Sequence, residues 1–223
     1  MPQPLSKFRE INDLSTGPNA FVRHTYLASL ITEYINACSY IDSAMGEILA
    51  LCLKGQTRVG VSMYHATTSA EAKHAMIKSA VEVSRSKRDN ILFNKILKAI
   101  KPIRDRRNDF AHHLWGTSSS ISDGLLLIDP RDELAYSIAW HHTARTGRWP
   151  KALMSTFGGY DLSKIYVYRK NDLERELKNA LDGLYCVGLF RNFLTQKGSE
   201  RAETRKTLID QPLLKRVGRI QPR

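Results

Sequence analysis

A regular apolar spacing near the start of the chain constrains its fold more than any other sequence feature. From about Asn19 to Leu53, apolar residues recur mostly at steps of three and four, which is the spacing of one face of an α-helix. They are Leu27, Leu30, Ile31, Tyr34, Ile35, Cys38, Ile41, Met45, Ile48 and Leu49. The spacing predicts a long amphipathic helix and a mainly helical fold.

Further helices are indicated by capping residues. Thr68-Ser69-Ala70-Glu71 has the spacing of a capping box and predicts the start of a second helix. Asp89 is expected to cap a third helix, after a break at 84–88. A second capping box, Asn171-Asp172-Leu173-Glu174, opens the last helix.

Pro102 divides the middle of the chain in this interpretation. Proline cannot continue a helix without strain, but it suits the first turn of a new one or a kink. We therefore expect a separate helix from about Pro102 to Trp115, with Gly116 as the residue that follows its C-terminus.

A small β insertion is predicted at about 117–170. The turn signal Asp123-Gly124 precedes Leu125-Leu126-Leu127-Ile128, an apolar run of strand length. We interpret 133–140 as the returning strand, and Ile165-Tyr166-Val167-Tyr168 as a further short strand. The predicted fold class is mainly α: an up-and-down bundle of four to five helices with a small β-hairpin insertion.

The ends of the chain differ in composition from its middle. Residues 1–18 are polar and contain proline, so we expect a flexible lead-in. Residues 197–223 are rich in Lys and Arg and predict a basic tail that is disordered or folds on a partner. The helical domain then spans 19–196.

Charge is the first indication of a partner. The 223 residues carry a formal net charge of +12, which favours a polyanion such as nucleic acid. No apolar run reaches the length of about 20 residues that a membrane span needs, and the N-terminus lacks the apolar core of a secretion signal. We expect a cytoplasmic protein with no membrane partner. Cys38, Cys52 and Cys186 lack metal-ligand spacing and are expected to be buried core residues.

The residues best suited to bind phosphate and transfer protons lie between Arg104 and Gly116. On a helix, Asn108 and His112 share one face, and Arg104 extends that stripe by one turn. Arg107 lies about 140° around the helix from His112. Its long side chain, or a second copy of the protein, is needed to bring guanidinium and imidazole to one phosphate.

The segment Arg107-Asn108-Asp109-Phe110-Ala111-His112 resembles the Arg-polar-x-x-x-His motif of the HEPN superfamily, helical domains of many prokaryotic toxin, defence and RNA-cleaving proteins. The resemblance implies metal-independent RNA cleavage in a cleft between two subunits, without a cofactor. It implies that Arg107 holds the scissile phosphate and that Asn108 orients Arg107 or the substrate. His112 moves protons for attack by the 2′-hydroxyl, which leaves a cyclic phosphate and a 5′-hydroxyl.

Neighbouring residues complete the predicted site. Lys101, Arg104, Arg106 and His113 are expected to bind the substrate. The expected partners are RNA, a second copy in a homodimer, and an antitoxin or another protein. One HEPN subgroup, paired with nucleotidyltransferase antitoxins, carries a Tyr two residues beyond the motif His; here that residue is Leu114, so modification of a tyrosine there is excluded.

Other interpretations of the same residues stay open. The chain can be a catalytically silent HEPN-like domain that binds RNA, nucleotide or protein, or a structural interaction protein with a basic tail. At residue level, Arg107 can be salt-bridged on a helix surface, Asn108 can make an inter-helix hydrogen bond, and His112 can be a core histidine.

Two histidine pairs and a tryptophan-rich stretch are also candidates for binding a metal ion or nucleic-acid bases. The pairs His112-His113 and His141-His142 are adjacent on the chain and point about 100° apart on a helix, so no metal site is predicted. The stretch 140–149 interleaves tryptophans with Arg and His. It is either a surface that stacks bases and binds phosphates or a loop packed on the bundle by its tryptophans.

Overall fold

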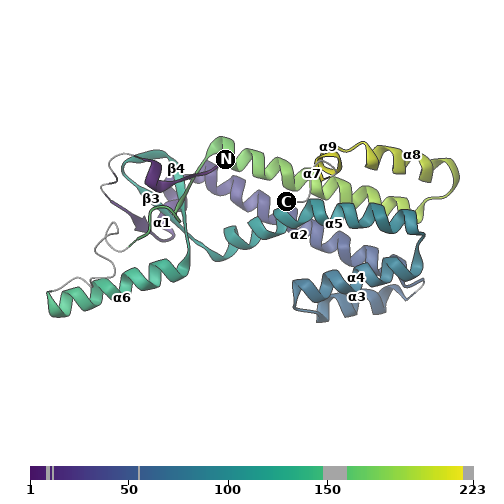
Figure 1. Ribbon diagram of the computed structural model, residues 1–223, viewed down its shortest axis with the longest axis horizontal. Coiled ribbons are helices and arrows are strands. Elements are labelled where there is room, and N and C mark those ends of the chain that lie inside the picture. The colour runs from purple at the N-terminus through teal and green to yellow at the C-terminus, as the bar shows by residue number, and fades with distance from the viewer. Residues whose placement is uncertain (9–10, 12, 55, 148–159, 218–223) are drawn as a thin grey trace. The chain divides into compact units, whose positions relative to one another are not determined.

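The computed structural model describes the whole chain except residues 9, 10, 12, 55, 148–159 and 218–223 (Figure 1). The protein is mainly helical with a small antiparallel sheet, which confirms the coarse prediction. It divides into two compact units: unit 1 comprises Met1–Glu33 and Arg107–Leu177, and unit 2 comprises Tyr34–Arg106 and Lys178–Arg223.

The helices carry most of the described residues. They are α1 (Asn19–Arg23), α2 (Thr25–Cys52), α3 (Thr57–Ala66), α4 (Ala70–Ser84), α5 (Lys87–His112), α6 (Pro130–Thr146), α7 (Lys170–Thr195), α8 (Gly198–Ile209) and α9 (Pro212–Val217), with a short 3-10 helix at Leu5–Lys7. The division between the units falls within α2, α5 and α7.

Unit 1 contains the sheet. Its strands are β1 (Gln3–Pro4), β2 (Ser15–Thr16), β3 (Leu114–Ser118), β4 (Ile121–Ile128) and β5 (Tyr166–Arg169), in the order β1-β5-β4-β3-β2 and antiparallel throughout. Both short outer strands come from the first 18 residues, where we expected a flexible lead-in. Leu5 and Ile11 are buried in a core with residues of β4 and β5, and this burial holds the segment in place.

The prediction that a helix continues to Trp115 and ends at Gly116 is wrong. Helix α5 ends at His112, and Gly116 lies in β3, paired with Leu126 and Thr16. Extended backbone lets Trp115 turn inward, where its Nε1 donates to the carbonyl of Phe110 at 3.2 Å. A Cβ at Gly116 would lie 2.7 Å from the carbonyl oxygen of Ser15, so the close approach of β2 requires glycine.

The predicted returning strand at 133–140 is also wrong, because this segment belongs to α6. Capping residues at both ends of the segment favour a helix over a strand. The Asp129 side chain accepts from the backbone N–H of Arg131, Pro130 occupies the first turn, and Gly147 ends the helix at φ +67°. These signals outweigh the weak strand propensity of the segment.

Unit 2 is helical. Tyr34 on α2 is buried, and its hydroxyl donates to the carbonyl of Ile103 on α5 at 2.7 Å. Phe93 of α5 stacks on Phe190 of α7 with ring centroids 5.0 Å apart.

Pro102 does not start a new helix, contrary to our expectation, since α5 runs through it. Proline has no N–H to donate to the carbonyl of Lys98, which costs one helix hydrogen bond. The ring lies on the exposed side, whereas Ile100 and Ile103 on either side of it are buried. Tertiary packing therefore holds the helix together across the proline.

Helix starts also differ in detail from the capping predictions. Ser69, not Thr68, caps α4 by accepting from the backbone N–H of Ala72. Ser86, not Asp89, accepts the capping bond of α5. The last long helix begins at Lys170, before the predicted capping box, and the carboxylate of Asp172 accepts from the N–H of Arg169.

Much of the predicted basic tail is structured. It forms α8 and α9, and Leu208 and Leu214 are buried. Arg201 of α8 lies 2.9 Å from Asp89 of α5 and over the ring of Phe193 of α7. Residues 218–223 of the tail lie outside the described part of the chain.

Cys38, Cys52 and Cys186 are buried free thiols, as predicted. Burial raises the pKa of Cys186 to about 12. Among the described residues, no helix combines the length and apolarity needed to cross a membrane.

Candidate functional site

The predicted catalytic residues lie at the C-terminal end of α5, in unit 1. Arg107 is half-buried, and its Nη1 donates to Oδ1 of the exposed Asn108 at 3.3 Å. The bond joins two side chains that are neighbours on α5. One turn later, His112 is exposed at the last residue of the helix.

An aromatic cluster fixes this end of α5. Phe110 is 2% exposed, and its ring centroid lies 5.3 Å from that of Trp115 and 5.2 Å from that of Tyr168. Because Phe110 is anchored inward, the residues on the opposite side of the last turn point to solvent. Burial of the Phe110 side chain therefore leaves Asn108 and His112 exposed to solvent.

This geometry removes some of the open alternatives. The exposure of His112 excludes a core histidine. The amide oxygen of Asn108 accepts from Arg107, its neighbour on α5, rather than from another helix. Within the described residues, no ion pair joins Arg107 to an acidic side chain, and its hydrogen bond goes to a neutral amide.

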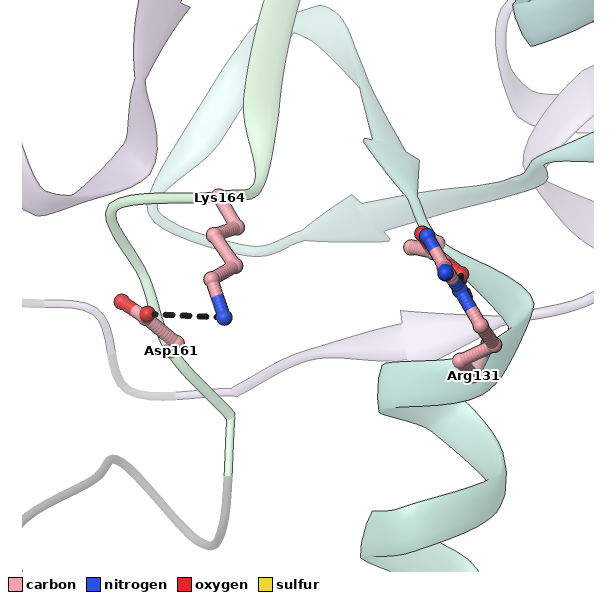
Figure 2. Close-up of polar contacts among 4 residues, drawn as sticks. Arg131, Asp161 and Lys164 are labelled. Atoms are coloured by element: carbon pink, nitrogen blue, oxygen red, sulfur yellow. Dashed lines mark hydrogen bonds and ion pairs between the residues drawn. The ribbon is translucent and has the colours of Figure 1, made fainter.

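His113 follows the end of α5 and is half-buried. Its Nδ1 is buried, and no described group forms a hydrogen bond with it. His113 lies close enough to Asp129 to contribute to the low pKa of that carboxyl, which depends mainly on hydrogen bonds from Arg131. Figure 2 shows Arg131 on the first turn of α6, together with the ion pair of Asp161 and Lys164 ahead of β5.

The other predicted substrate-binding residues belong to unit 2, since the division falls between Arg106 and Arg107. Lys101 is exposed and forms an ion pair with Asp105 at 2.6 Å, one turn later on α5. Arg104 and Arg106 are half-buried.

Sequence reasoning missed a polar cluster in unit 2. The hydroxyl of buried Tyr64 on α3 donates to Asp42 of α2 at 2.6 Å, and Lys73 of α4 lies 4.3 Å above the Tyr64 ring. Burial and the bond to Asp42 raise the pKa of Tyr64. Burial, followed by the charge of Arg104, lowers the pKa of His74 to about 4. No local spacing links these residues, because the contacts join four different helices.

The tryptophan-rich stretch is helical as far as it is described. Trp140, His141, His142 and Arg145 of α6 are exposed, and Trp140 is 57% exposed. Trp140 therefore does not pack a loop onto a core. Arg148 and Trp149 lie outside the described residues.

A search for metal-binding groups and three comparisons with known proteins complete the description. No group of three or more His, Cys, Asp or Glu side chains in the described part of the chain is placed to hold a metal ion. Comparison of the chain with protein-family models, with curated proteins and with solved structures gives no match.

Proposed function

We propose that the protein is a HEPN-like, metal-independent endoribonuclease of the toxin or defence type, acting as a homodimer. The observation that carries the proposal is the bond between Arg107 and Asn108, one turn before the exposed His112. The proposal takes α2, α5 and α7 as the main helices of an up-and-down bundle of HEPN type.

In this proposal each residue has a role in phosphoryl transfer. Arg107 binds the scissile phosphate and stabilises the charge that develops on it. His112 accepts the proton of the 2′-hydroxyl, because a histidine exchanges protons near neutral pH. The 2′-oxygen forms a bond to phosphorus, the bond to the 5′-oxygen breaks, and an imidazolium returns a proton to the leaving oxygen. The products are a 2′,3′-cyclic phosphate and a 5′-hydroxyl.

A second copy completes the proposed site. Arg107 lies about 140° around α5 from His112, so one helix does not direct both groups at one phosphate. Light scattering is expected to give twice the 25.3 kDa mass of the chain. A monomer that cleaves RNA would contradict the shared site.

The central experiment measures RNA cleavage in excess EDTA. Wild type is expected to cleave, and His112→Ala to lose activity by about 10²- to 10⁴-fold. His65→Ala is the matched control, because His65 is also an exposed helical histidine and lies outside the motif and the 140–149 stretch. Circular dichroism establishes that both variants fold. Equal cleavage by His112→Ala and wild type refutes the proposal.

The nature of the products gives a second test. A single 2′-deoxynucleotide at the cleaved position is expected to block cleavage there, since it removes the attacking hydroxyl. Mass spectrometry of the products is expected to find the cyclic phosphate. A 3′-hydroxyl product would indicate a different reaction.

A second candidate is a catalytically silent HEPN-like domain that binds RNA, nucleotide or protein. One observation favours it: among the described residues, no hydrogen bond orients the His112 ring, whereas a general base is commonly held by a partner group. This candidate predicts that wild type binds RNA without cleaving it, and that His112→Ala binds equally well.

A further inference from the structure

The part of α5 that belongs to unit 2 carries a concentration of positive charge. Between Lys87 and Arg106 it has seven basic residues, Lys87, Arg88, Lys95, Lys98, Lys101, Arg104 and Arg106, and two acidic ones. Both acidic side chains already have partners. Asp89 is buried and lies 2.9 Å from Arg201, and Asp105 pairs with Lys101.

Four of these cations are exposed and share one side of the helix. Lys87, Arg88, Lys95 and Lys98 fall within about 100° of the helix circumference and along about 17 Å of its axis. We call them the α5 basic face. Across the described residues, none of the four forms an ion pair. The opposite side of α5 is buried, with Phe93, Ile96 and Ile100 each at most 1% exposed.

The neighbouring long helix has the opposite character. Helix α2 contains no Lys or Arg, and in unit 2 its acidic residues Asp42 and Glu47 are paired with Lys73 and Arg191. The positive charge of α5 is therefore not shared by α2. Like charges three or four residues apart repel each other on a helix, as Lys95 and Lys98 do here, and a polyanion relieves that repulsion.

We infer that the α5 basic face binds the phosphate backbone of RNA. The inference rests on the proposed function for its choice of RNA as the polyanion. Neutralising phosphates with Lys and Arg releases condensed counterions, which gives binding that weakens steeply with salt. The four residues that define the face are cations, which bind phosphate oxygens of any sequence, so we expect the face to hold the backbone without reading a base sequence.

Fluorescence anisotropy tests the inference with a fluorescein-labelled single-stranded RNA of about 20 nucleotides, a length over which backbone contacts on the α5 face are possible. The full chain carries His112→Ala in every sample, so that RNA stays intact. In the test variant, Lys87, Arg88, Lys95 and Lys98 are all changed to Gln. In the control, Arg58, Lys178, Lys197 and Lys206 of the same unit are changed to Gln. All four are exposed, and none has an ion-pair partner among the described residues.

The two variants have the same net charge but different expected affinities. Loss of four phosphate contacts is expected to weaken binding about 10²-fold near 0.1 M salt and to reduce the slope of log K against log salt by about 3. The control is expected to change affinity by less than about 3-fold, which is the effect of long-range charge alone. A third variant, with Lys87, Lys95 and Lys98 changed to Arg, keeps the charge and is expected to bind like the parent.

The outcomes separate this inference from the proposed function. Equal weakening by the test and control variants, or no binding by the parent, overturns the inference. If either result is found but the protein with His112 intact cleaves RNA, only the inference about the α5 basic face is refuted. The ribonuclease proposal is then still supported. Conversely, loss of binding only in the test variant, with no cleavage by the wild type, supports the α5 basic face and refutes the ribonuclease.

Discussion

Helices α2 and α5 have similar buried faces, but their exposed faces differ in charge. They have 28 and 26 residues, and each buries an aliphatic row that includes Ile41 and Ile48 on α2 and Ile96 and Ile100 on α5. Outside, α2 has no Lys or Arg, whereas α5 has eight over its full length. Packing in the core constrains the residue types on both inner faces. The outer charge is free of that constraint and is the better guide to a partner.

The outer face of α2 in unit 2 carries exposed Tyr40 and the paired acids Asp42 and Glu47, but no basic residue. With α7 it lines a pocket of about 350 Å³, walled by Tyr40, Tyr185 and Leu189 among others. An ion pair at this pocket joins Glu47 and Arg191 at 2.9 Å, and the two charges cancel. The contrast with α5 teaches that the net charge of +12 is unevenly placed on the long helices.

The largest expected effect tests the likeness of the inner faces. Ile41→Ala on α2 and Ile96→Ala on α5 each remove a side chain that is at most 1% exposed. Each is expected to lower the free energy of unfolding by about 2–5 kcal/mol, through lost burial and the cavity that remains. Urea unfolding followed by circular dichroism measures both. If one substitution costs less than a third of the other, the two helices do not contribute equally to the core.

A smaller effect tests the electrostatics between the two helices. His74 of α4 is influenced by Arg104 and Lys101 of α5, which lower its pKa, and by Asp42 of α2, which raises it. Desolvation is the largest cause, and the pKa falls from 6.5 to about 4 on folding. Because the folded pKa is lower, the unfolded chain binds the proton first as pH falls. The contribution of His74 to stability is constant above pH 6.5 and declines as the pH falls from 6.5 to 4.

The measurement compares His74→Gln with wild type by urea unfolding at pH 7.5 and pH 4.5. Wild type is expected to lose about 1–2 kcal/mol more than the variant across that interval, a figure discounted for partial solvent screening. The exposed His65→Gln of α3 serves as the control. Parallel pH profiles for wild type and His74→Gln would show that the ring titrates normally in the folded protein.

The smallest effect concerns the exposed ion pairs on the outer faces. Asp105→Asn breaks the pair with Lys101 on α5, and Glu47→Gln breaks the pair between α2 and Arg191. Each is expected to change the free energy of unfolding by about 0.5 kcal/mol or less, because solvent screens exposed charges. Thermal unfolding in low and high salt measures both. A change above 1 kcal/mol in either variant would mean that an outer face contributes to stability.

The helical class and α2 were predictable, because an apolar period of three and four residues reports a buried helix face directly. The fate of Pro102 was not, since it depends on burial of Ile100 and Ile103 by residues distant in sequence. The segment 133–140 belongs to α6 instead of the predicted returning strand, because Asp129-Pro130 ahead of it starts a helix rather than a turn. That dipeptide is the local signal that identifies α6.

The site was partly accessible to sequence reasoning. Helical periodicity predicted that Asn108 and His112 share a face, and both are exposed on α5. The hydrogen bond from Arg107 to Asn108 depends on rotamers, which the sequence does not specify. The cluster of Asp42, Tyr64, Lys73 and His74 arises from tertiary contacts alone.

Because the three cysteines are buried, we expect the native thiols of the folded protein to react slowly with thiol reagents. A thiolate is the reactive species, and both burial and the high pKa of Cys186 suppress it. A cysteine introduced at an exposed position, such as Lys98→Cys on α5, can therefore be labelled selectively with a maleimide dye. The labelling rate of the native thiols then reports the rate or extent of unfolding, because these thiols react only when the core opens.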